Sequence, residues 1–399
     1  MGDRTGGNLI LSAEPLADAV DILAALVGFD TTSRNSNLAL VEWVEAYLGR
    51  LGVESRRVYN DEGSKANLIA VVGPAGRPGY VLSGHTDVVP VDGQAWASDP
   101  FTLTRRGDRL YGRGATDMKG YLACVLASVP LMLAAPLRDP FVLAFSYDEE
   151  VGCLGAPRLV EDLVAHGPGG LACFVGEPSN MNVVIGHKSK RSFSVDVRGL
   201  TAHSSLAPRA VNALEYAALV VARIRAIGRR LAAPDALRDE MYDVAVTTAH
   251  TGTFHSGSAL NIVPDFASFD FEFRGLGGAD LQALVDEVLA YAGDELEPEM
   301  RAIHADAGFE FRERARFPGL ETDPDAPVVA LAKALARKNG HSKVAYGTEA
   351  GIFSTAGIPT VVIGPGSITE AHIEDEYIDE AELAHCLAFL ARLVAHVRA

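Results

Sequence analysis

The feature that most constrains this chain is a set of five short motifs of histidine and carboxylate residues, each of which closes or follows an apolar run. The motifs contain His85, Asp117, Glu150, Glu177 and His372. Histidine nitrogens combined with carboxylate oxygens suit Zn²⁺, Co²⁺ or Mn²⁺ better than an all-oxygen Ca²⁺ site. Such residues at strand ends, drawn from distant parts of the chain, indicate ligands for a pair of divalent metal ions.

The first part of the chain alternates between helical and strand patterns. Apolar residues recur at helical spacing over residues 15–27 and 38–51, with Ser36 or Asn37 available as an N-cap. Short apolar runs of the buried-strand type cover residues 68–72, 80–83, 141–146 and 172–175. This order predicts an α/β fold with helices on both faces of a sheet.

A different pattern begins near Lys188. It predicts strand, helix, strand, strand, helix and strand over residues 191–197, 207–225, 243–253, 262–274, 279–291 and 301–314. The order βαββαβ is that of a ferredoxin-like unit. The longest uncharged run, residues 121–137, is shorter than the ~20 residues that span a bilayer and contains two prolines, so it predicts a buried helix.

Composition limits the partners. The chain has 399 residues, 48% of them hydrophobic, which suggests two domains at ~150 residues each. A formal net charge of −17 argues against nucleic acid and an anionic membrane surface, because both need clustered lysines and arginines. Residues 1–14 lack the apolar core of a signal peptide, and the four single cysteines fit reduced thiols. We expect a soluble cytoplasmic protein with small-molecule partners.

Other catalytic classes find little support. The chain has no GxSxG elbow, no HExxH helix and no GxxxxGK[ST] loop. A GxGxxG-like string starts at Gly112, but Asp117 stands at its last glycine position and would repel a pyrophosphate. A single carboxylate at a strand end is most often a cap or a solvated loop residue. Three carboxylates in a row at residues 148–150, however, would repel one another unless a cation lies beside them.

These motifs carry a resemblance that runs from Phe29-Asp30-Thr31 to Gly364-Pro365-Gly366. The chain resembles the M20 family of co-catalytic dizinc amidohydrolases and peptidases, and within it most the acetylornithine deacetylases. The resemblance implies a zinc-peptidase-like three-layer catalytic domain over residues 1–186 and 315–399. A ferredoxin-like lid and dimerisation domain would be inserted over residues 187–314.

The resemblance also implies a ligand set for two divalent metal ions per chain, Zn²⁺ with Co²⁺ able to substitute. His85 and Glu177 would hold one ion, Glu150 and His372 the other, and Asp117 would bridge them.

Two further residues have implied roles beside these ligands. Asp87 lies two residues after His85, where its carboxylate would accept the other ring N–H and fix the tautomer. Glu149 precedes a ligand without being one, and the family uses this position as the general base and acid. The resemblance further implies a cis peptide bond between Asp117 and Met118.

Four residues concern the substrate and the oligomer. His203 matches the family loop whose histidine polarises the substrate carbonyl from a neighbouring subunit, so a homodimer through the lid is expected; an exposed loop histidine is the alternative. Asn261 and Arg274 resemble positions that hold the substrate carboxylate and backbone, although Arg274 could be a strand-end surface charge. Glu349 offers an anion for a cationic side chain, or belongs to a loop that caps the next helix.

The resemblance implies hydrolysis of the amide bond of an N-acyl amino acid, above all of N2-acetyl-L-ornithine to L-ornithine and acetate in arginine biosynthesis. Other M20 activities remain open, namely acetylcitrulline deacetylase, succinyl-diaminopimelate desuccinylase and carboxypeptidase-like hydrolysis. A catalytically silent M20-like binding protein is an alternative of a different class. Such a protein should lack a ligand or the general base, and here all six residues are present.

Overall fold

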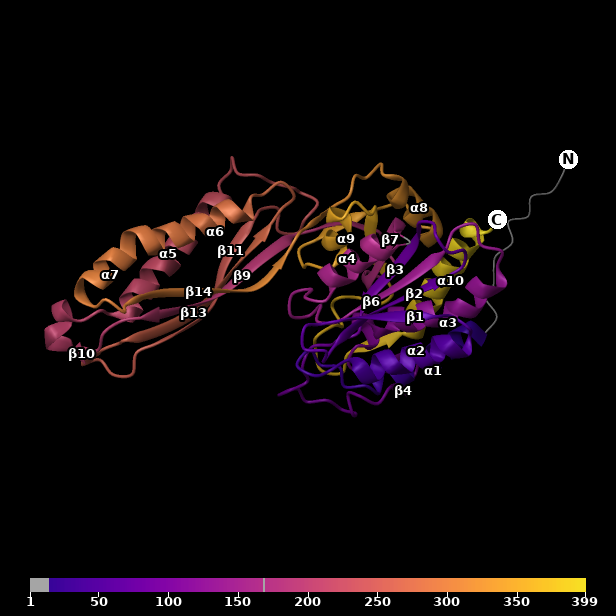
Figure 1. Cartoon of the computed structure of the whole chain (residues 1–399), viewed down its shortest axis with the longest axis horizontal. Coiled ribbons are helices and arrows are strands. Elements are labelled where there is room, and N and C mark those ends of the chain that lie inside the picture. The colour runs from indigo at the N-terminus through magenta and orange to yellow at the C-terminus, as the bar shows by residue number, and fades with distance from the viewer. Residues whose placement is uncertain (1–13, 168) are drawn as a thin grey trace. The chain divides into compact units, whose positions relative to one another are not determined.

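The computed structural model describes residues 14–167 and 169–399, which form two compact units (Figure 1). Residues 1–13, where the sequence shows no signal-peptide pattern, lie outside the described residues. The first unit comprises the described residues up to Gly186 together with Leu320–Lys343 and Thr348–Ala399. The second unit comprises His187–Gly319 and Val344–Gly347.

The return to the first unit falls at Leu320 rather than at the predicted residue 315. Strand β14 (Gly308–Phe317) remains paired with β9 (Ser189–Arg198) as far as the pair Phe317 and Lys190. The backbone therefore stays in the second unit until that ladder ends.

The first unit is built around a nine-stranded mixed sheet. Its strands follow the order β1 (Ser55–Tyr59), β2 (Ala66–Val72), β6 (Phe141–Ser146), β3 (Gly79–His85), β7 (Gly170–Pro178), β17 (Thr360–Gly364), β8 (Val184–His187) and β15 (Leu320–Glu321), with β16 (Ser342–Val344) paired to β8. The neighbours β6, β3, β7 and β17 run parallel. Every residue of β3 and β6 is buried, as expected for parallel strands covered on both faces.

Helices cover both faces of this sheet. One hydrophobic core joins the sheet to α1 (Glu14–Val27), α2 (Leu38–Arg50), α3 (Gly120–Ala134), α8 (Pro327–Ala336) and α10 (Glu380–Val397). Leu68 and Leu143 belong to this core, whereas their buried neighbours Ile69 and Val142 face the opposite side, because successive strand residues alternate. Helices α4 (Ala156–His166) and α9 (Ala350–Thr355) pack there. The predicted α/β fold is confirmed.

Helix α3 is the core helix that the sequence predicted. Together with the preceding π-helical turn η1 (Ala115–Lys119), it is the one helix of the described residues long and apolar enough to cross a membrane. However, 78% of its apolar window is buried inside the protein, where it packs against α1 and α10. Burial of this kind is typical of a core helix.

A three-stranded sheet brings two distant segments of the first unit together. Its order is β18 (Tyr377–Asp379), β5 (Arg109–Tyr111) and β4 (Thr104–Arg106). The pairing of β18 with β5 continues into a hydrogen bond from Gly112 N to Glu376 O. Residues 112–117 and 372–376 are thereby held side by side.

The second unit has the predicted βαββαβ order. Strands β11 (Thr248–Ser256), β13 (Phe266–Gly275), β9 and β14 form an antiparallel sheet in that order, and α5 (Ala213–Leu231) and α6 (Leu281–Ala290) share one core with it. The smaller elements are β10 (Ala202–His203), paired with β12 (Ile262–Val263), the turns η2 (Ser204–Arg209) and η3 (Tyr291–Leu296), and α7 (Glu297–Ile303).

Several predicted boundaries in the second unit were wrong. Strand β11 begins at Thr248 instead of residue 243. Helix α5 begins at Ala213 instead of residue 207, because the Asn212 side chain caps it by accepting from Leu214 N. The strand predicted over residues 262–274 is interrupted at Pro264, whose ring nitrogen has no hydrogen to donate to a ladder. Residues 301–303 belong to α7 rather than to the last strand.

Candidate metal centre

The five predicted ligands meet at one end of the parallel part of the first unit's sheet. His85 ends β3, Glu150 follows β6, and Glu177 lies near the end of β7. Because these strands are parallel neighbours, their carboxyl ends lie at the same edge. Asp117 joins them from η1 and His372 from the segment before β18. The cis peptide bond between Asp117 and Met118 that the resemblance implied is present.

Asp117 lies between the two histidines. Its Oδ1 is 3.1 Å from His85 Nε2, and its Oδ2 is 3.2 Å from His372 Nε2. A second carboxylate accompanies each ring: Glu177 Oε1 is 3.7 Å from His85 Nε2, and Glu150 Oε2 is 3.1 Å from His372 Nε2. The two oxygens of the Asp117 carboxylate thus lie near two separate pairs of candidate ligands, each made of one histidine and one glutamate.

The ligand atoms also form a continuous cluster. Those of His85, Asp117 and Glu150 lie within 4.8 Å of one another, as do those of His85, Glu149 and Glu177. His85 belongs to both groups, so proximity alone does not assign the residues to two separate metal ions. The bridging position of Asp117 supports the division that the resemblance implied.

The electrostatics of the cluster fit bound cations. Burial raises the pKa of Glu149 to about 8 and that of Glu150 to about 7, and it raises the pKa of Glu177 well above its usual value. Glu177 Oε1 is buried with no hydrogen-bond partner among the described residues. Buried carboxylates this close repel one another unless positive charge lies between them. The donor set, two imidazoles and carboxylates, suits Zn²⁺ or Co²⁺.

The carboxylate of Asp87 has different partners from those we predicted. His85 Nδ1 lies 2.9 Å from the backbone oxygen of Asp87 but 3.6 Å from the carboxylate. The carboxylate instead accepts from the backbone N–H of Glu149 at 3.0 Å and from Ser33 Oγ at 2.7 Å. Asp87 therefore orients His85 through its carbonyl, and its side chain holds the turn that carries Glu149 and Glu150.

That turn also separates the three consecutive carboxylates. Asp148 adopts a left-handed backbone conformation, φ 55°, and its side chain forms an ion pair with Lys65 at 2.5 Å. Part of the predicted repulsion is thus relieved by a lysine. Glu149 and Glu150 remain in the cluster, and the thiol of Cys153 is 3.3 Å from Glu149 Oε1.

A buried hydrogen-bond network behind the candidate ligands was not predicted from the sequence. Glu376 Oε1 accepts from the backbone N–H of Asp117 at 3.1 Å, and Glu376 Oε2 accepts from Arg113 Nη1 at 2.6 Å. Arg113 Nη2 donates to Gln94, whose amide in turn donates to the carbonyl of His372 at 2.9 Å. Both Arg113 and Glu376 side chains are only 1% exposed. The network fixes the backbone of two ligands, a contact between distant segments that no local spacing reveals.

Glu349 lies beneath the strands instead of facing a substrate. Its side chain is fully buried, and its two oxygens accept from Ser83 Oγ and Ser146 Oγ, both at 2.6 Å. Burial raises its pKa, although the two hydroxyls oppose that shift. With both oxygens occupied, Glu349 offers no free anion to a cationic side chain in this conformation.

The three predicted residues of the second unit lie at two different ends of it. Ala202–His203 pairs with Ile262–Val263, and Asn261 O accepts from Ser204 N, so His203 and Asn261 are neighbours. Both are exposed and lie beyond the Phe266 end of β13. Arg274 is at the other end of that strand. Eight residue steps of about 3.3 Å put these ends about 26 Å apart, so one small molecule cannot touch both in one chain.

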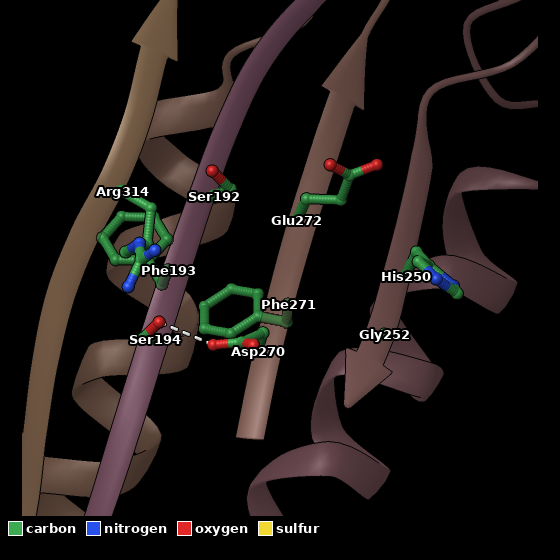
Figure 2. A pocket seen from close by; sticks show the side chains of 9 residues that line it. All are labelled: Ser192, Phe193, Ser194, His250, Gly252, Asp270, Phe271, Glu272 and Arg314. Carbon is green, nitrogen blue, oxygen red and sulfur yellow. Dashed lines mark hydrogen bonds between the residues drawn. The ribbon is translucent and has the colours of Figure 1, made fainter. Parts of the chain in front are cut away.

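The acidic side chains on the open face of the second unit's sheet have hydrogen-bond donors of the same face beside them. Figure 2 shows a pocket of about 200 Å³ on this face, lined by side chains that include Asp270, Glu272 and Arg314. Asp270 accepts from Ser194 Oγ at 2.6 Å, and this bond lowers its pKa. Glu272 accepts from Arg274 Nε at 2.7 Å, so the guanidinium of Arg274 is already engaged.

The site combines two histidines with buried carboxylates at the carboxyl end of the parallel strands, and a further carboxylate lies beside them. Metal-dependent hydrolases use sites of this kind. The chain belongs to peptidase family M20/M25/M40, whose model matches residues 81–396. It is therefore a metal-dependent hydrolase that acts on amide bonds.

Curated relatives and solved structures agree with this membership. The chain is 34% identical over 379 residues to the acetylornithine deacetylase of Myxococcus xanthus, covering 94% of this chain and 96% of that protein. It is 30% identical to the acetylornithine deacetylase of Klebsiella pneumoniae, covering 94% and 97%. An M20 family metallo-carboxypeptidase from Sulfolobus solfataricus superimposes with a TM-score of 0.74 at 17% identity, covering 94% of this chain and 98% of that chain. A dinuclear metal-binding M20 peptidase from Bacillus subtilis superimposes with a TM-score of 0.64 at 15% identity, covering 97% of this chain and 99% of that chain. Both likenesses show the fold.

Proposed function

We propose that this chain hydrolyses the amide bond of an N-acyl amino acid, and that N2-acetyl-L-ornithine is its substrate. The observation that carries the proposal is the carboxylate of Asp117 placed between His85 and His372, each with a second carboxylate beside it. The relatives named acetylornithine deacetylase, at up to 34% identity over nearly the whole chain, support the substrate. The reaction would serve arginine biosynthesis in the cytoplasm.

In this proposal His85 and Glu177 would hold one divalent ion and Glu150 and His372 the other, and the carboxylate of Asp117 would serve both. When bound, the two ions would supply Lewis-acid activation of a water and of the scissile carbonyl. Glu149 is the general base: its carboxylate takes a proton from the attacking water and returns it to the leaving amine. Asp87 keeps Glu149 in place through the hydrogen bond to its backbone.

The working unit in this proposal is a homodimer. In one chain, His203 and Asn261 lie beyond the Phe266 end of β13, which is about 26 Å from Arg274, so a substrate held by all three needs two chains. The second unit offers surfaces for such pairing: β11 is an edge strand with most residues exposed, and Leu260, Ile262 and Phe266 are exposed near His203.

Substrate recognition in this proposal uses Arg274 for the carboxylate and Asn261 for the backbone. Arg274 would exchange Glu272 for the substrate, because a guanidinium binds carboxylates bidentately. Glu349 stays in the proposal only as a support of the metal centre, given its two serine partners. The ornithine ammonium must then be held by another acid.

A panel of N-acyl amino acids tests the proposal. Purified protein with Zn²⁺ or Co²⁺ is assayed on N-acetylornithine, N-acetylcitrulline, N-succinyl-diaminopimelate and a dipeptide. The proposal predicts the highest kcat/KM for N-acetylornithine. Preference for another member would assign one of the other M20 activities, and no hydrolysis of any member by the metal-loaded chain would favour a silent binding protein.

A further inference from the structure

The first unit contains a second pocket whose charge is opposite to that of the metal centre. It has a volume of about 490 Å³ and lies where the end of α8 meets α10. The lining residues are Asn180, Met181, Ala336, Arg337, Lys338, Glu382, His385, Ala388 and Arg392. Nothing in the proposed reaction uses any of them.

Three basic side chains line this pocket without a carboxylate partner. Arg337, Lys338 and Arg392 form no ion pair with any acid in the described part of the chain, although the protein has 52 acidic and 35 basic residues. Elsewhere in the same unit, Arg57 and Arg158 each pair with an acid. Single basic residues without an acid partner also occur elsewhere in this unit, as Lys119 does, so the distinguishing feature is that three of them line one hollow of an acidic protein.

The acid in the pocket does not neutralise them. Glu382 Oε1 is 3.2 Å from His385 Nδ1, and Glu382 Oε2 accepts from the backbone N–H of Gly366 at 3.1 Å. Both oxygens therefore have partners of their own. Burial and the neighbouring Arg337 together lower the pKa of Arg392, which shows that the two guanidinium groups feel each other's charge. An anion bound between the two guanidinium groups would offset this repulsion.

The end of α8 explains only part of this charge. Arg392 Nε donates to Leu335 O, a carbonyl of the last helical turn. A helix carboxyl end carries roughly half a negative charge, which a single basic residue offsets. Three unit positive charges exceed that requirement, and the Nη groups of Arg392 have no acceptor within hydrogen-bond distance among the described residues.

We propose that this pocket binds a small dianion of the phosphate type, as free phosphate or as the phosphoryl group of a monoester. Guanidinium groups bind phosphate oxygens with two parallel hydrogen bonds, and Lys338 adds a point charge. Asn180 also lines the pocket, and its side-chain amide is a neutral donor. Because 490 Å³ is more than a phosphate ion fills, the pocket has room for the organic part of a monoester.

Calorimetric titration of the metal-loaded enzyme at constant ionic strength tests the proposal. The probes are inorganic phosphate, glycerol 3-phosphate and acetate, which separates a free dianion from a monoester and from a monoanion. The pocket variant is R337N/K338Q, since asparagine tolerates the left-handed backbone of Arg337, φ 56°. The matched control is Arg50→Gln, which removes a basic residue from the last turn of α2, outside the pocket.

Saturable binding of one phosphate-type probe per chain is expected, about tenfold or more weaker in R337N/K338Q and unchanged in Arg50→Gln. Acetate should bind at least tenfold more weakly than the dianions. Arg337→Lys, which keeps the charge, should retain most of the affinity and guards against a folding defect in the double variant. Absence of saturable binding overturns the proposal. So does binding that survives in R337N/K338Q, because it would place the anion at the metal centre.

Discussion

Three glutamates of the first unit and two acids of the second unit have opposite surroundings. At the metal centre, Glu149, Glu150 and Glu177 are buried, their pKa values are raised, and one Glu177 oxygen has no partner among the described residues. On the open face of the second unit's sheet, Asp270 and Glu272 have lowered pKa values. Asp270 accepts from the hydroxyl of Ser194 (Figure 2), and Glu272 accepts from the guanidinium of Arg274.

The difference shows how the surroundings of a carboxylate indicate whether it binds a cation. A carboxylate that accepts from neighbouring donors has what it needs from the protein. A buried carboxylate with a raised pKa has too little positive charge around it, and several such carboxylates at one place, one of them with an unsatisfied oxygen, indicate a cation. The same residue types therefore mark a metal centre in one unit and an ordinary polar surface in the other.

The strongest test of this contrast replaces one acid by its amide in each unit. Glu149→Gln keeps the size of the side chain but removes the proton acceptor, so kcat should fall by ~10²–10⁴-fold with metals still bound. Asp270→Asn is the matched change in the second unit and should leave kcat within about twofold. Steady-state kinetics and metal analysis of both variants decide the matter. Loss of metal in Glu149→Gln would mean that Glu149, and not Glu150, is a ligand.

A complementation experiment tests whether the second unit contributes to catalysis. His203→Ala should lower the rate by ~10²–10³-fold, the usual effect of removing one oxyanion donor. Mixed with Glu149→Gln chains, it should regain activity, because one site of each mixed dimer then has an intact Glu149 and the partner subunit's intact histidine. Mixed dimers that form and stay inactive would show that His203 does not act across the interface.

The buried network behind the ligands should affect metal affinity more than the fold. Glu376→Gln keeps the shape but weakens the bonds to Arg113 and to the Asp117 backbone, so metal affinity should fall by about 10- to 100-fold. Glu374→Gln is the control, since Glu374 is an exposed acid of the same segment that accepts from Ala95 N. Equal metal affinities in the two variants, measured by competition with a chelator, would remove the network from the account.

The smallest expected effect concerns the substrate carboxylate. Arg274→Lys keeps the charge but loses the planar pair of donors, so KM should rise on the order of tenfold with kcat little changed. Arg198→Lys, at the other end of the same sheet, should leave KM unchanged. If the unmodified enzyme hydrolysed a carboxyl ester of its substrate equally well, Arg274 would not recognise that carboxylate.

Much of this protein was predictable because its apolar runs are continuous and its ligands follow them directly. Residues 141–146 coincide with β6, and the candidate ligand His85 ends β3 as its motif indicated. The βαββαβ unit followed from the order of alternating and helical patterns. Boundaries were less predictable where a single side chain decides them, as Asn212 does for α5.

Most of the contacts that were missed join distant segments. Arg113 and Glu376 are 263 residues apart, and nothing in either local sequence shows that they form a buried pair. Glu349 was assigned to the substrate because its charge suits a cation. The chain instead places it under β3 and β6, where two serines occupy its oxygens. Asp87 has the predicted position, but its carboxylate holds a backbone rather than a ring.

The most direct test of the central claim is the number of divalent ions that one chain binds. Chelated protein is titrated with Zn²⁺ or Co²⁺ by calorimetry, and hydrolysis is assayed at each step. We expect two ions per chain at saturation and no hydrolysis before the first is bound. Asp117→Ala should lose this stoichiometry, because Asp117 faces both histidines. A single ion at saturation, two ions retained by Asp117→Ala, or hydrolysis by the metal-free chain would contradict a two-metal centre.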